Sequence, residues 1–232
     1  KEKIDSALAV SIRGPQKQVL VVDDDPDARA TVVDYLTSMG FKDIHACEGG
    51  KEALAYLTKS GDKVGLIISD WEMPELSGVE LLAFCKRVPN LREVPFLIVT
   101  SQTSIERMKV MSAAKERVDD YLLKPFMLDE MKRRIESLIE RSRTHSEVHD
   151  LSIQANDALE HGKYAQAQNM FDEILRINPE SDVALRGMGE ALLRLKGAQA
   201  ALPFFKKAID SNPVNPKGYL RLAYAYEQVG LV

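Results

Sequence analysis

The sequence predicts two domains: an α/β domain built on a doubly wound, five-stranded parallel sheet, and an all-α helical-repeat domain. In the first part of the chain, five short apolar runs alternate with helical patterns. This alternation is typical of a parallel sheet with helices on both faces. From Asp150 onward the strand patterns stop, helical spacing alone remains, and a period of 34 residues appears.

The elements of the first domain follow from β-branched runs and from apolar residues at helical spacing. Gln18 to Asp23 reads QVLVVD, which suits a strand buried on both faces. Pro26 suits the first turn of the next helix, which should end at Gly40. The remaining strands and helices are expected, in alternation, at Ile44 to Ala46, Ala53 to Leu57, Val64 to Asp70, Val79 to Phe84, Pro95 to Thr100, Ile105 to Met111, Tyr121 to Lys124 and Leu128 to Ile139.

The last helix of this domain should serve as a helical connector. Its apolar spacing persists through Arg143 and loosens from Thr144 to His149. The expected divisions are an N-terminal extension at 1–17, the α/β domain with its connector at 18–143, and the helical repeats at 144–232.

The second domain repeats small and aromatic residues every 34 positions. Small residues allow paired helices to approach closely, and phenylalanines fill the gap to the next pair. The pattern resembles tetratricopeptide repeats, with two whole repeats and a third first helix from Pro216 to Val229. The resemblance implies a concave groove that binds a protein or peptide. The matching positions are Leu151, Ala155, Ala167, Phe171 and Pro179, then Leu185, Gly189, Ala201, Phe205 and Pro213, then Tyr219 and Ala223.

Composition excludes several classes of protein. A net charge of -4 and a pI near 5.7 disfavour nucleic acid as the main partner. Cys47 and Cys85 lie in apolar segments, as expected for reduced thiols in a cytoplasmic protein. No apolar run is long enough to span a membrane, and the first residues hold no signal-peptide core. The chain does not begin with Met and ends inside a repeat, so we expect it to be part of a longer protein.

Polar side chains follow four of the expected strands. The first strand ends in Asp23, Asp24 and Asp25, and the third ends in Asp70. Ligands collect at the carboxyl ends of parallel strands, so these groups should meet. Carboxylates this close must take up protons or hold a cation, and Mg²⁺ prefers such oxygen ligands. A carboxylate beside the metal can attack phosphorus and form an acyl phosphate. The fourth and fifth strands add Thr100, Ser101 and Lys124, which can bind phosphoryl oxygens.

Four motifs in these positions resemble the receiver domain of two-component response regulators. They read VLVVDDDPDAR, LIISDWEMPELSGVELL, PFLIVTS and DDYLLKPF, and the resemblance covers residues 18 to about 141. It implies a flavodoxin/CheY-like sheet and a cis peptide bond between Lys124 and Pro125. It also implies site roles for seven residues. Asp70 would be the phosphoacceptor, with Thr100 and Lys124 as its catalytic partners; Thr100 and Tyr121 would form the switch; and Asp23, Asp24, Asp70 and the main-chain carbonyl of Glu72 would bind Mg²⁺.

Several of these residues also have a purely structural interpretation. The triple aspartate could simply cap the following helix, Asp70 could be a turn residue, Thr100 could start a helix, and Lys124 could be solvated. Gly78 is interpreted as a permissive turn before the third helix. The stretch from Ala113 to Asp119 is slightly longer than the small Gly-Ala turn usual in receivers, which leaves open an extended or redirected fourth helix and a nonstandard dimer contact or output surface.

The leading functional hypothesis is a response regulator in a phosphorelay. A sensor histidine kinase or phosphotransfer protein would phosphorylate Asp70 with Mg²⁺, and the change would alter which protein or peptide the repeats bind. The chain would catalyse its own phosphoryl transfer and dephosphorylation without being an enzyme in the usual sense. A second copy could join through the receiver, and neither nucleic acid nor a membrane is expected as a partner.

Three alternatives stay open. The chain could regulate an enzymatic or DNA-binding output domain that lies outside it, or it could be a constitutive scaffold with an inert receiver. A phosphatase with an aspartyl-phosphate intermediate is weaker, because the position two residues after Asp70 holds Glu72.

Overall fold

The computed structural model describes residues 17–101 and 118–230. Contacts divide the chain into two compact units, with the division after Thr144. The expected helix from Ile105 to Met111, most of the long stretch before Asp119, and nearly all of the expected N-terminal extension lie outside the described residues.

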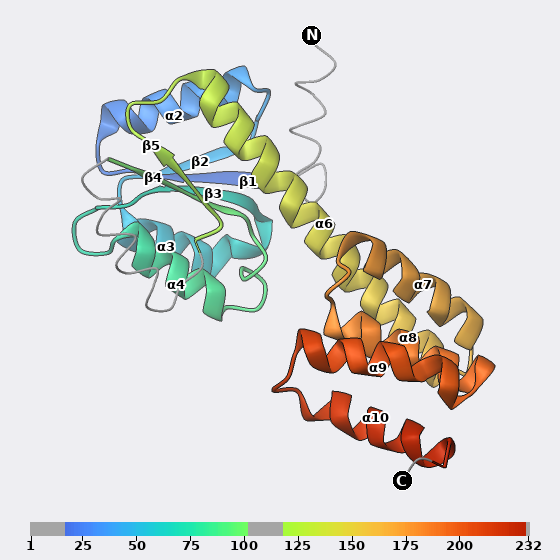
Figure 1. Ribbon diagram of the computed structural model, residues 1–232. Coiled ribbons are helices and arrows are strands. Elements are labelled where there is room, and N and C mark those ends of the chain that lie inside the picture. The colour runs from blue at the N-terminus through green and yellow to red at the C-terminus, as the bar shows by residue number, and fades with distance from the viewer. Residues whose placement is uncertain (1–16, 102–117, 231–232) are drawn as a thin grey trace. The chain divides into compact units, whose positions relative to one another are not determined.

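The first unit is built on a five-stranded sheet in the order β2-β1-β3-β4-β5, with every pair parallel (Figure 1). This confirms the predicted α/β doubly wound fold. The order places the carboxyl end of β3 at the middle of the sheet, between β1 and β4. The strands are β1 (Gln18–Val22), β2 (Ile44–Cys47), β3 (Val64–Asp70), β4 (Phe96–Thr100) and β5 (Asp120–Leu123).

Helices cover both faces of this sheet. Figure 1 shows α2 (Pro26–Ser38) and the first part of α6 (Leu128–Glu160) on one face, and α3 (Gly50–Ser60) and α4 (Gly78–Arg87) on the other. A short 3-10 turn, η1 (Gly61–Lys63), follows α3. Alternate strand residues belong to two separate hydrophobic cores, so that Ile67 packs toward α3 and α4 while its neighbour Ile68 packs toward α2 and α6. Strands buried on both faces explain the unbroken apolar runs.

Two helix starts lie beside the strand ends and fix the local backbone. Asp25 caps α2, because its Oδ1 accepts hydrogen bonds from the backbone N–H groups of Asp27 and Ala28. Ser77 and Glu80 form a capping box at the start of α4. Both caps follow a strand directly or after a short loop, so they hold the chain where it leaves the sheet.

The connector differs from its prediction. The loosening expected from Thr144 to His149 is absent, and α6 continues without a break to Glu160. The segment contains neither Gly nor Pro, so nothing in it breaks a helix. Val148 and Leu151 also pack against the core of the second unit, which makes the helical conformation there favourable.

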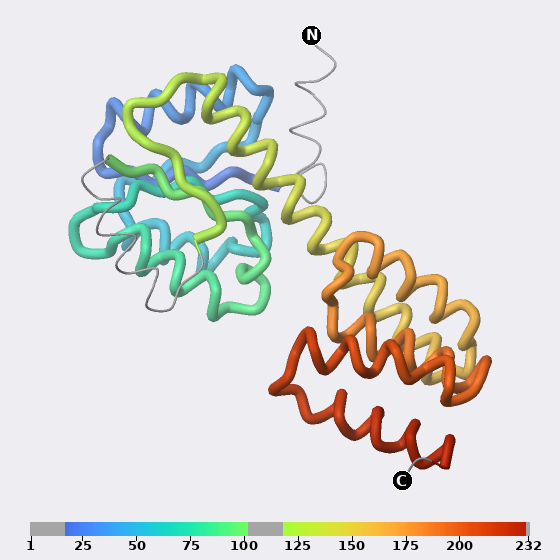
Figure 2. The backbone as a smooth tube through the Cα atoms, in the orientation of Figure 1, coloured from blue at the N-terminus to red at the C-terminus, as the bar shows by residue number. Residues whose placement is uncertain are grey.

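Helices are the only regular elements in the second unit from residue 145 to 230. The last part of α6 is followed by α7 (Tyr164–Ile177), α8 (Asp182–Lys196), α9 (Ala198–Ser211) and α10 (Pro216–Gln228), and Figure 2 follows the backbone back and forth through them. Five of the repeat positions, Ala155, Ala167, Phe171, Ala201 and Phe205, are fully inaccessible to solvent, whereas the matching positions of the third first helix, Tyr219 and Ala223, are exposed.

Glycines make the close helix contacts of this unit. A Cβ atom added to Gly187 would lie 2.2 Å from Cζ of Phe171, and one added to Gly189 would lie 2.5 Å from Cε1 of Phe205. The sequence analysis singled out Gly189 but not Gly187. In the described part of the chain, no helix is both long and apolar enough to cross a membrane.

Candidate functional site

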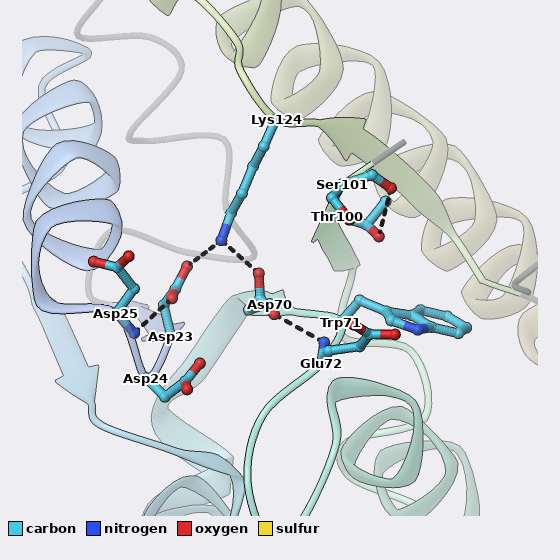
Figure 3. A pocket seen from close by; sticks show the side chains of 9 residues that line it. All are labelled: Asp23, Asp24, Asp25, Asp70, Trp71, Glu72, Thr100, Ser101 and Lys124. Atoms are coloured by element: carbon cyan, nitrogen blue, oxygen red, sulfur yellow. Dashed lines mark hydrogen bonds and ion pairs between the residues drawn. The ribbon is translucent and has the colours of Figure 1, made fainter. Parts of the chain in front are cut away.

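A pocket of about 310 Å³ lies at the carboxyl ends of β1, β3, β4 and β5 (Figure 3). The structure therefore brings together the predicted acids, hydroxyl and cation from four separate strands. Tyr121 is not among the residues that line it. The lining residues are Asp23, Asp24, Asp25, Asp70, Trp71, Glu72, Thr100, Ser101 and Lys124.

Lys124 bridges the two most buried carboxylates of the pocket. Its Nζ donates hydrogen bonds to Oδ1 of Asp70 at 2.5 Å and to Oδ2 of Asp23 at 2.9 Å. The side chains of Asp70 and Asp23 are 12% and 4% exposed, whereas that of Lys124 is 30% exposed. One ammonium group thus offsets part of the repulsion between two carboxylates. The Lys124–Pro125 peptide bond is cis, as predicted.

Burial and charge act in opposite directions on these groups. Burial raises the pKa of Asp70 and the charge of Asp23 adds to this, while hydrogen bonding to Lys124 opposes it. Burial acts to lower the pKa of Lys124, but its hydrogen bonds to Asp70 and Asp23 outweigh burial, so that this pKa is raised. Lys124 therefore keeps its positive charge, and Asp70 holds a proton more tightly than an exposed aspartate does.

The three consecutive aspartates have different surroundings. Asp25 is exposed, and the backbone hydrogen bonds from Ala28 and Asp27 lower its pKa, so the capping interpretation holds for this residue. Asp23 instead points to Lys124, and its Oδ1 accepts from the backbone N–H of Asp25 at 3.0 Å. Arg29 Nη1 donates to the main-chain oxygen of Asp23 at 2.6 Å, a contact that the sequence analysis missed. No periodicity in the sequence signals this contact.

The other side of Asp70 is held by the chain that follows it. The backbone N–H of Glu72 donates to Oδ2 of Asp70 at 2.8 Å, and the N–H of Trp71 donates to the main-chain oxygen of Val99 at 2.9 Å. Thr100, on β4, is 1% exposed, and its hydroxyl donates to the main-chain oxygen of Ser101. Both carboxylate oxygens of Asp70 thus have donors.

The donor set fits a hard metal ion such as Mg²⁺. Asp23, Asp24 and Asp70 offer carboxylate oxygens, and Glu72 offers a main-chain carbonyl. Among residues 17–101 and 118–230, however, no three acidic, histidine or cysteine side chains converge as a preformed metal site. In Figure 3, Asp23 and Asp70 turn toward Lys124, and Asp24 lies apart from this group. The assignment of these four ligands stays a prediction.

Gly78 contacts the backbone of the site. Its N–H donates to the main-chain oxygen of Trp71 at 3.1 Å, and an added Cβ would lie 2.1 Å from the main-chain oxygen of Asp70. Its φ is not positive, so the predicted role as a permissive turn is wrong. Glycine is needed here because the backbone of residue 78 lies too close to that of Asp70 for a side chain to fit.

Gly78→Ala should therefore force the backbone at Asp70 to move and cost about 2–3 kcal/mol of unfolding free energy, measured by urea titration. Gly49→Ala is the matched control, because an added Cβ there meets nothing within 4 Å. It should cost less than about 1 kcal/mol, chiefly through a weaker helix cap. Equal losses in the two variants would contradict the proposed backbone clash.

Comparisons with known proteins match both units. The family described as response regulator receiver domain matches residues 19–136, and the tetratricopeptide repeat family matches residues 154–229. The chemotaxis protein CheY homolog of Campylobacter jejuni is 34% identical over 122 residues, which cover 53% of this chain and 92% of that protein.

Solved structures match the same part of the chain. Chemotaxis protein CheY4 of Vibrio cholerae matches with a TM-score of 0.46 at 28% identity, covering 53% of this chain and 98% of that one. A structure described as adenylate cyclase from Rhodopirellula baltica matches with a TM-score of 0.50 at 26% identity, covering 59% of this chain and 96% of that one.

Proposed function

The chain belongs to the response regulator receiver family, with tetratricopeptide repeats after the receiver, and from this premise we propose that phosphorylation of Asp70 controls what the repeats bind. The family matches confirm the receiver and the repeats that the motifs predicted. Receiver domains interact with histidine kinases or phosphotransfer proteins, so the phosphoryl donor is proposed to be one of these.

One observation supports the choice of Asp70 above all others. Its carboxylate lies at the carboxyl end of the central strand β3, within hydrogen-bonding distance of Lys124 Nζ and of the backbone N–H of Glu72. Asp23 has the same two kinds of donor, Lys124 and the backbone N–H of Asp25, but its side chain is only 4% exposed, against 12% for Asp70. Asp70 is thus the more accessible of the two aspartates that Lys124 binds.

The proposed reaction transfers a phosphoryl group from the donor to Asp70. A carboxylate oxygen of Asp70 attacks phosphorus, the bond from phosphorus to the leaving group breaks, and the leaving group departs with its electron pair and takes a proton from water. Lys124 releases Asp70 and binds a phosphoryl oxygen, and the Thr100 hydroxyl turns from Ser101 to donate to another. Attack of water on phosphorus later regenerates the carboxylate.

Bound Mg²⁺ would supply positive charge that offsets the phosphoryl oxygens. Asp23, Asp24, Asp70 and the carbonyl of Glu72 are the proposed ligands. Lys124 already donates hydrogen bonds to both Asp23 and Asp70, so its ammonium group would have to leave at least one of them for that carboxylate to bind the metal.

A route from the receiver to the repeats is proposed to run through α6. Asp120, at the start of β5, forms ion pairs with Arg134 at 3.2 Å and Arg141 at 2.7 Å, both on α6. The guanidinium of Arg134 also lies over the ring of Tyr121, 5.8 Å from its centroid. Since α6 also carries Ala155 of the first repeat, a rotation of Tyr121 would act on a helix that both units share.

The test uses Trp71, the only tryptophan, which lines the pocket and is 6% exposed. Fluorescence is followed while Mg²⁺ is added, and then acetyl phosphate or beryllofluoride. The proposal expects a saturable change that requires Mg²⁺. No change, together with no incorporation of phosphate measured directly, would instead favour a passive scaffold.

Lys124→Ala should retain Mg²⁺ binding and lose the response to beryllofluoride. The carboxylates remain, but the cation that would bind a phosphoryl oxygen is gone, so we expect the response to weaken at least about tenfold. Lys51→Ala is a matched control, because Lys51 forms an ion pair with Glu75 in which both side chains are 63% exposed. A normal response in Lys124→Ala would make Lys124 merely structural.

A further inference from the structure

A row of charged side chains runs along α8 in the second unit. Asp182, Arg186, Glu190 and Arg194 follow at intervals of four residues, which places neighbours one turn apart. Arg186 Nη2 lies 3.4 Å from Oδ2 of Asp182, and Arg194 Nη2 lies 3.7 Å from Oε1 of Glu190. Helix α10 adds Arg221, whose Nε lies 3.3 Å from Oε2 of Glu190. Three arginines therefore meet two carboxylates.

The carboxylates of this row do not satisfy its arginines. Oδ2 of Asp182 also accepts from Nδ2 of Asn212 at 3.4 Å and of Asn215 at 2.7 Å. Oε2 of Glu190 has no hydrogen-bond partner among the described residues, and neither arginine beside it donates a side-chain hydrogen bond within that part of the chain. Each guanidinium carries five donors. The row thus offers many more donors than its own acceptors receive.

These unused donors are accessible and lie beside apolar side chains. Arg194 and Arg221 are 50% and 48% exposed. On α10, Leu220 is 69% exposed and Tyr224 is 40% exposed, and helical geometry places Tyr224 one turn from both Leu220 and Arg221. Arginine and tyrosine are enriched among the residues that dominate binding energy in protein interfaces.

We propose that this surface, called the arginine face (Arg194, Arg221, Leu220 and Tyr224), binds an acidic peptide segment of a partner protein. Carboxylates of the segment pair with the guanidinium groups, and an apolar side chain of the segment packs on Leu220 and Tyr224. The inference rests on the proposed function only in treating the repeats as protein-binding, and it does not require phosphorylation.

Charge favours a short peptide over a nucleic acid. From residue 145 to 232 the chain carries nine Lys and Arg against eleven Asp and Glu. The arginine face is therefore a local positive patch on a unit that is net acidic. A phosphate backbone would extend beyond such a patch and meet negative charge. A segment with a few carboxylates around an apolar anchor matches the patch better.

The test measures fluorescence anisotropy of a labelled twelve-residue peptide, made of Glu with a central Leu and Tyr, titrated with the whole chain. Arg194→Glu and Arg221→Glu should each weaken binding at least about tenfold, because each replaces attraction by repulsion. Arg176→Glu on α7 is the matched control. Arg176 is 78% exposed and forms the same kind of pair with Asp172, four residues away, so this variant should change affinity less than about twofold. Circular dichroism checks that all three variants fold.

Three outcomes would overturn the inference: no saturable binding by the wild-type chain, equal weakening in Arg176→Glu, or tighter binding of a single-stranded oligonucleotide that depends on the same arginines. Asp70→Asn separates this inference from the proposed function, because that variant should bind the peptide normally. Loss of peptide binding with intact phosphate uptake refutes only the arginine face. Loss of phosphate uptake with intact peptide binding refutes only the phosphorylation proposal.

Discussion

Asp70→Asn is expected to lower phosphoryl uptake from acetyl phosphate to less than about a hundredth of the wild-type level, because an amide cannot act as the nucleophile that forms an acyl phosphate. The neighbouring Asp23 should not substitute for it, since its side chain is only 4% exposed, against 12% for Asp70. Intact-mass spectrometry after incubation with Mg²⁺ and acetyl phosphate measures the uptake. Phosphate found on another residue at a comparable level would contradict the assignment.

The same substitution should leave the sheet folded. The pKa of Asp70 is raised in the folded protein, so the folded state binds this proton more tightly than the unfolded state does. The stabilisation that this carboxyl group contributes is complete below its pKa in the unfolded chain. It is lost as the pH rises through its pKa in the folded protein. The amide of the variant has no proton to lose in this range, so at neutral pH its unfolding free energy should be no lower than that of the wild type. Urea unfolding followed by Trp71 fluorescence checks this, and the advantage should shrink on acidification.

Strand positions could be predicted from the sequence where burial is complete. The predicted bounds of β3, Val64–Asp70, match the structure at both ends, because polar residues flank a largely apolar run. The predicted edges of β1 and β5 are each one residue off: Asp23 lies just beyond β1, and β5 begins at Asp120 and ends before Lys124. Strand ends are defined by ladder hydrogen bonds, which single-residue patterns do not encode.

The site could be predicted as a set of residues but not as a geometry. Parallel topology alone brings Asp70 and Lys124 to one edge of the sheet. That Lys124 also binds Asp23, 101 residues away, depends on where the long side chain points, and no sequence pattern specifies it. Gly187 was missed for a similar reason, because its role depends on the ring of Phe171 in another helix. Gly78 shows the same limit, since its need for space comes from the backbone of Asp70.

Phe205→Ala is expected to cost the second unit about 3–5 kcal/mol, the range for removing a fully buried aromatic ring. Phe205 is inaccessible to solvent, and its ring fills the space where Gly189 lacks a side chain. Alanine would leave a cavity between α8 and α9 that the helix backbones cannot close without losing their other contacts. The stability of a repeat unit is a sum of repeat and interface terms, so a loss of this size should unfold most of the small helical unit under mild conditions.

Two probes can separate this loss from the receiver. Far-UV circular dichroism reports the helices of both units, whereas Trp71 fluorescence reports the first unit alone. In Phe205→Ala the dichroism midpoint in urea should fall, and the fluorescence midpoint should stay near its wild-type value. Phe204→Ala, the same change one residue earlier at a half-buried position, should cost only about 1 kcal/mol. If both midpoints fell together, the two units would unfold as one, and the repeats would be coupled thermodynamically to the receiver that is proposed to control them.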